Sequence, residues 1–100
     1  MTYLVTFEGE SNEESDALDN RLDAVMEALL DGGARDPDIG AALTRGSFEI
    51  SLRIDAERIE DAVSEAARIV RDALHEAGAD AIRFAQARAS DDTRTVLAPA

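Results

Sequence analysis

Apolar and polar residues alternate strictly from Ser47 to Asp55. The apolar side consists of Phe48, Ile50, Leu52 and Ile54. The other side consists of Ser47, Glu49, Ser51, Arg53 and Asp55. A repeat of two residues is typical of a β-strand with one buried face and one exposed face. We therefore predict a strand over 47–55 whose apolar side faces the core.

The hydrophobic period changes to that of an amphipathic helix immediately after this strand. The residues that follow one helical face are Ile59, Ala62, Val63, Ala66, Ile69, Val70, Ala73, Leu74 and Ala77. Asp55 is placed to cap the start of the helix, and Gly78 is placed to end it. The pattern predicts a helix over 56–77.

The first third of the chain has the same order of patterns. Alternation over 2–8, ending at Gly9, predicts a strand, and an apolar stripe over 16–31 predicts a helix. The stripe is made of Leu18, Leu22, Val25, Met26, Leu29 and Leu30. Ser11 and Glu14 have the spacing of a capping box, and Gly32-Gly33 supplies a stop.

Two weaker strands complete the pattern. We expect a turn-rich link over 34–38 around Pro37, a strand over 39–44, and a hairpin at Arg45-Gly46. The last strand is expected over 81–89, with Ile82 and Phe84 facing inward. The composition from Ser90 onward is polar and small, so we expect one domain over 1–89 and a flexible tail over 90–100.

The predicted order is strand, helix, strand, strand, helix, strand. Right-handed crossovers place both helices on one face of a four-stranded antiparallel sheet, with the first and third strands in the centre. The sequence therefore predicts an α+β protein with the ferredoxin-like βαββαβ fold, a sandwich of one sheet and one helical layer.

Three short motifs carry a resemblance to a known group of proteins. They are Asp36-Pro37-Asp38-Ile39-Gly40-Ala41, the Arg45-Gly46 hairpin and the helix ending Ala73 to Gly78. Over residues 3–88 the chain resembles small uncharacterised ferredoxin-like proteins of high-GC actinobacteria. The resemblance implies this fold and a cytoplasmic location, and it carries over no functional residue.

The charge of the chain narrows the choice of partners. The chain has 22 acidic and 10 basic residues, all of the latter Arg, which gives a formal net charge of −12. A negative field opposes binding to nucleic acid and to anionic membranes. No apolar run reaches the length of a membrane span, so we expect a cytoplasmic protein.

Catalytic and metal-binding patterns are missing from the sequence. Without cysteine there is no thiolate ligand or cysteine nucleophile, and a single histidine excludes a histidine pair within one chain. The acidic run from Glu8 to Asp19 lacks the spacing of a calcium-binding loop, and the glycines lack the spacing of a phosphate-binding loop. We predict no metal and no cofactor.

The sheet face that the helices leave open is the remaining candidate. We expect it to present small residues: Leu4, Thr6, Ala42, Ser51, Ala85 and Ala87. It offers no aromatic residues for stacking RNA bases. A flat face of small residues favours contact with another sheet. The leading hypothesis is thus a non-enzymatic protein–protein interaction module, a homodimer or a partner of another protein.

Two other interpretations of this face remain open. One is a small-ligand sensor or enzyme with its pocket at a dimer interface, for which Arg53, Arg83 and Glu49 are the candidate contacts. The other holds that these three residues only form cross-strand charge pairs on a solvated face.

Overall fold

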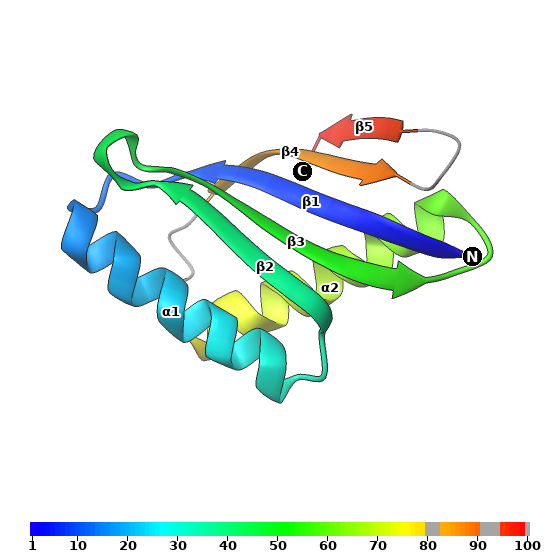
Figure 1. Ribbon diagram of the computed structural model, residues 1–100, viewed down its shortest axis with the longest axis horizontal. Helices are drawn as coiled ribbons and strands as arrows, with labels where there is room; N and C mark the ends of the chain where they lie inside the picture. The colour runs from blue at the N-terminus through cyan, green and yellow to red at the C-terminus, as the bar shows by residue number, and fades with distance from the viewer. Residues whose placement is uncertain (80–82, 91–94, 100) are drawn as a thin grey trace.

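The computed structural model describes residues 1–79, 83–90 and 95–99. Its elements in chain order are β1 (Thr2–Glu10), α1 (Ser15–Asp31), β2 (Arg35–Ala42), the 3-10 helix η1 (Leu43–Arg45), β3 (Ser47–Asp55), α2 (Ile59–Glu76), β4 (Arg83–Ser90) and β5 (Thr95–Pro99). The strands form one antiparallel sheet in the order β2-β3-β1-β4-β5. Both helices lie on one side of it (Figure 1). The predicted ferredoxin-like fold is confirmed.

The core lies between the sheet and the two helices. The strict alternation of β3 places Phe48, Ile50 and Leu52 there, each at most 3% exposed. From β1, Val5 stands opposite Leu52 and is also fully buried. The helices contribute most of the predicted stripes, but Leu30, which we expected on the stripe of α1, is 57% exposed. Among the described residues, the opposite side of β1, β3 and β2 is left without a helical cover (Figure 1).

The hairpin between β2 and β3 turns at Gly46, as the sequence predicted. Gly46 has a φ of +67°, and a Cβ there would lie 2.2 Å from the Ser11 carbonyl oxygen. The Gly46 carbonyl in turn accepts a hydrogen bond from the Ser11 amide at 2.8 Å. The hairpin thus packs tightly against the segment that leads from β1 to α1, and only glycine fits at its tip.

β2 begins earlier than predicted. Arg35 to Asp38, which we expected as a link, belongs to the strand, and the chain from Leu43 to Arg45 is a turn of 3-10 helix. The register shifts between Arg35 and Asp38, where Asp36 has a φ of +47°. A proline such as Pro37 is tolerated at an irregularity in an edge strand, so its presence did not end the strand.

The helix starts also differ from the prediction. α2 begins at Ile59 rather than 56, with Arg58 at the N-cap and no side-chain cap. Asp55 remains the last residue of β3, where it accepts a hydrogen bond from the Thr2 hydroxyl. The expected capping box is not formed either, because Ser11 Oγ accepts from the Glu13 amide at 3.1 Å and α1 starts after Glu14.

The segment after β4 adds a fifth strand to the four expected. We predicted a tail from Ser90 onward, but Thr95–Pro99 pairs antiparallel with Gln86 to Ser90 of β4. We read the whole segment as a tail because most of its residues are small or polar. It nevertheless contains the short sequence Thr-Val-Leu-Ala-Pro, which is compatible with an edge strand. β5 therefore widens the sheet beside β4 (Figure 1).

Candidate functional site

The open face of the sheet is centred on two hydroxyl side chains. Thr6 of β1 and Ser51 of β3 are register partners, and their hydroxyl oxygens lie 3.0 Å apart within hydrogen-bond distance. Thr6 is only 3% exposed although neither α1 nor α2 covers this side, and its register partner on β4 is Arg88. Leu4 and Ser51 are half-buried. The centre of the face therefore combines two short hydroxyl side chains with the longer Arg88 of β4.

One end of the face, beside the β2–β3 hairpin, carries two carboxylates and one guanidinium. Glu8 and Glu49 are direct cross-strand partners, an arrangement in which like charges repel. Arg88 lies between them, with Nη1 3.1 Å from Glu8 Oε1 and Nη2 3.4 Å from Glu49 Oε2. We call Glu8, Glu49 and Arg88 the hairpin-end cluster. Arg88 forms an ion pair with each carboxylate and so offsets part of the repulsion between Glu8 and Glu49.

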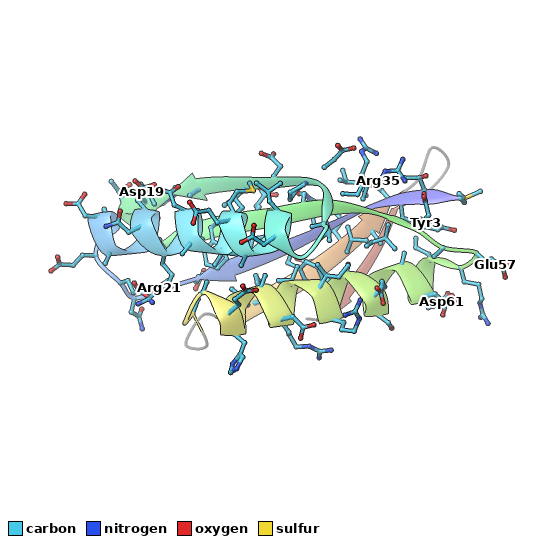
Figure 2. The ribbon with its side chains drawn as sticks, turned by 90° about the horizontal axis from the view of Figure 1, so that it is seen from below. Tyr3, Asp19, Arg21, Arg35, Glu57 and Asp61 are labelled. Atoms are coloured by element: carbon cyan, nitrogen blue, oxygen red, sulfur yellow. The ribbon has the colours of Figure 1, made fainter. Side chains whose placement is uncertain are left out.

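The opposite end of the face carries two guanidinium groups. Arg35 and Arg53 are register partners on β2 and β3. Arg35 Nη1 lies 2.6 Å from Asp55 Oδ2, and Arg53 Nε lies 3.6 Å from Asp36 Oδ2. We call Arg35, Arg53, Asp36 and Asp55 the terminal cluster; Figure 2 labels Arg35 at this end of the sheet. All four side chains are largely exposed.

Among the described residues of this face, Asp55 is the one whose side-chain pKa is clearly shifted. The hydrogen bond from the Thr2 hydroxyl lowers the pKa of the Asp55 carboxyl, and the positive charge of Arg35 lowers it further. Both partners stabilise the charged form, so Asp55 stays ionised at neutral pH. The terminal cluster is thus held as charged pairs, and nothing in it resembles a group poised for proton transfer.

The residues that the sequence analysis proposed as ligand contacts do not lie together in the structure. Arg53 lies in the terminal cluster and Glu49 in the hairpin-end cluster, each with its own partner of opposite charge. The Arg83 backbone pairs with Glu10 of β1, and its side chain lies outside the described residues. A site formed by all three within one chain therefore gains no support from the geometry.

A β-bulge changes which residues of β4 belong to the open face. Glu8 pairs with Gln86 but Gly9 pairs with Phe84, which leaves Ala85 as an extra residue in β4. Because of this shift, Ala87 stands opposite Phe7 and is 2% exposed on the helix side. The prediction that Ala87 lies on the open face is wrong.

The other predicted interface positions have mixed outcomes. Leu4, Thr6 and Ser51 belong to the open face, and Ala42 is half-buried on the edge strand β2. The side chain of Ala85 lies outside the described residues. The residue that the sequence analysis missed is Arg88. Polar Gln86, Arg88 and Ser90 alternate with Ala87 and Ala89, a pattern that places Arg88 on the exposed side. We missed it because we assigned the inward side of this strand from Phe84.

A groove lies at the hairpin end of the same face. It has a volume of about 470 Å³ and includes Glu8, Glu10, Arg45 and Glu49 in its lining. Gly40 and Ala42 of β2 also line it, and their lack of bulk leaves this space open. Within the described residues no group of three or more acidic or histidine side chains is arranged to hold a metal ion.

Neither a protein-family model nor a curated protein matches this chain. In the described part of the chain no helix is long and apolar enough to cross a membrane. The fold and the open face are therefore the observations on which function is argued.

Proposed function

We propose that this protein is a non-enzymatic protein–protein interaction module that self-associates through the open face of its sheet. The observation that carries the proposal is the pair of short hydroxyl side chains on that face, where Thr6 is 3% exposed and hydrogen-bonded to Ser51. Charged side chains at the two ends are held in pairs along the sheet. A sheet face without a helical cover is a surface on which a second sheet can stack.

The projected size of the face is somewhat below that of a standard dimer interface. Five strands about 4.8 Å apart and about eight residues long give a projected area of roughly 600 Å². Stable interfaces bury about 800 Å² of accessible surface per partner, and a corrugated face exposes more than its projection. The opposing term is the net charge of −12 on each copy, which weakens association at low salt.

The test compares two lysine variants of equal charge. Ser51→Lys places a long cation at the centre of the face, whereas Ser64→Lys places one on the exposed surface of α2. We expect the unaltered protein and Ser64→Lys to sediment as dimers at tens of micromolar, and Ser51→Lys to sediment as a folded monomer. A dimeric Ser51→Lys variant would show that the open face is not the contact.

A second candidate function rests on the groove beside the hairpin. Its 470 Å³ volume and its lining by Glu8, Glu49 and Arg45 suit a small polar ligand at the rim of the interface. A thermal-shift screen with a metabolite library tests it. A shift of several degrees with one class of compound would favour this sensor over the plain module, since a ligand at 100 times its Kd stabilises by about 2.7 kcal/mol.

The proposal also covers the cellular location of the protein and the group of proteins that it resembles. We place it in the cytoplasm among the small ferredoxin-like proteins of high-GC actinobacteria, as its sequence resemblance implies. Immunodetection of the tagged protein in fractionated cells tests the location. Recovery with the membrane or secreted fraction would contradict it.

A further inference from the structure

Another cavity lies on the helix side of the sheet, where α2 packs against β1 and β4. Its volume is about 170 Å³. Most of its lining is apolar and consists of Phe7, Val63, Ala67, Val70, Phe84 and Ala87. It shares no described lining residue with the groove beside the hairpin. A site here is therefore independent of the one proposed on the open face.

The bulge in β4 accounts for the space. Phe84 and Ala87 are three residues apart, yet both line the cavity, because the extra residue Ala85 shifts the strand by one position. Ala87 contributes only a methyl group, and the facing residue Ala67 of α2 is equally small and half-buried. Small side chains in both layers leave a gap between the sheet and the helix that the larger neighbours do not fill.

Arg71 is the one charged side chain among the described lining residues of this cavity. It is exposed and stands one helical turn after Ala67, so its guanidinium reaches water at the mouth. In the described part of the chain, the arginines that form ion pairs with carboxylates are Arg21, Arg35, Arg53, Arg58, Arg68 and Arg88. Arg71 and Arg45 form none with the described residues, and each lines a cavity. In a chain with 22 acidic residues, the mouth of this apolar cavity thus holds a positive charge without a carboxylate of its own.

We propose that this cavity binds a small aromatic carboxylate, with its ring in the apolar space and its carboxylate on Arg71. The volume sets the size of the ring, since an apolar cavity of about 150 Å³ holds benzene. The rings of Phe7 and Phe84 lie with their centroids 5.5 Å apart in the lining and favour contact with a further ring. A guanidinium matches a carboxylate with two parallel N–H···O bonds. The ligand is therefore a carboxylate joined by a short link to one ring.

The test titrates the protein with phenylacetate and with its neutral amide, phenylacetamide. The two compounds share ring and link, so the carboxylate is the difference between them. Backbone amide shifts in NMR spectra give both Kd values, and those around Phe7, Val63 and Ala87 should move. We expect phenylacetate to bind about 5-fold more tightly than the amide, which is the effect of a favourable exposed ion pair.

Two arginine variants of equal charge separate Arg71 from the general charge of α2. Arg71→Gln should bind the acid and the amide equally. Arg68→Gln is the control, because the Arg68 guanidinium is already paired with Glu65 and Asp72 on the same helix. It should keep the preference for phenylacetate. The same loss of preference in both variants would mean that the helix charge, and not Arg71, attracts the acid, and would overturn the proposal.

Ala67→Leu tests the apolar part of the site. The added carbon atoms occupy the cavity, so we expect both compounds to lose their binding while the Tm stays equal or rises. Unchanged binding to this variant would overturn the proposal, as would equal affinities for acid and amide in the unaltered protein. A monomeric unaltered protein would contradict the proposed function but not this site, since the cavity lies on the helix side of the sheet.

Discussion

At the scale of single residues, backbone geometry and hydrogen bonds constrain Gly46 and Asp55. Gly46 supports the hairpin because its φ is positive and the Ser11 carbonyl approaches it closely. Asp55, predicted as a helix cap, instead joins Thr2 of β1 and Arg35 of β2 at the terminal end of the sheet. The sequence could indicate the glycine turn, but Asp55's partners depend on strand pairing.

Gly46→Ala should destabilise the fold. A left-handed conformation costs an alanine roughly 1–2 kcal/mol, and the contact with Ser11 adds to this. For a domain of this size we expect the Tm to fall by about 5–15 °C in calorimetry. Gly40→Ala is the control, because a Cβ there meets nothing within 4 Å. Equal Tm values for the two variants would contradict the tight hairpin.

Asp55→Asn should remove a pH-dependent part of the stability. The pKa of the Asp55 carboxyl is lowered from its ordinary 3.8 by Thr2 and Arg35, so its contribution is present above that pH. It is lost as the pH falls through the folded-state pKa. Urea unfolding should thus show the variant less stable at pH 7, with the difference between the two proteins shrinking as the pH is lowered below 3.8. A difference unchanged across this range would mean that the carboxylate charge is not involved.

The elements were predictable where the hydrophobic period was strong. The alternation of β3 fixed both its limits and its buried side, and Gly32-Gly33 ended α1 where expected. β2 was placed too late because Pro37 resembled a turn, and β4 was phased wrongly beyond its bulge. A bulge depends on the partner strand, so the pattern of one strand alone does not reveal it.

Two asparagine variants test the bulge. Ala87 is buried on the helix side, so Ala87→Asn leaves a polar amide without water and should cost about 1–3 kcal/mol. Gln86 is half-buried on the open face, and Gln86→Asn should change the free energy of unfolding by less than about 0.5 kcal/mol. Denaturant unfolding measures both. The reverse ranking would mean that β4 follows the register without a bulge.

At the scale of the whole molecule, acidic charge opposes both folding and association. Ten arginines against 22 acidic residues leave a large excess of negative charge, even with the ion pairs on the sheet and on α2. The composition predicted this repulsion. The structure shows at which positions arginines reduce it. On the open face, Arg88 offsets part of the charge of Glu8 and Glu49, and Arg35 and Arg53 pair with Asp55 and Asp36 at the other end.

Sodium chloride should raise the Tm. The Debye length falls from about 30 Å at 0.01 M to about 3 Å at 1 M salt, so repulsion among exposed carboxylates fades over this range. We expect a steady increase in a calorimetric series, with protein concentration held constant because the proposed dimerisation would also affect the Tm. A flat or falling curve would show that the arginines already offset the acidic residues locally.

The most direct test of the account is the mass of the unaltered protein in solution. Sedimentation equilibrium at tens of micromolar protein and moderate salt should give twice the chain mass of 10.7 kDa. The dimer fraction should increase with salt as the repulsion between the two copies is screened. A mass of one chain under these conditions, unchanged by salt, would contradict self-association through the open face and leave that face solvated.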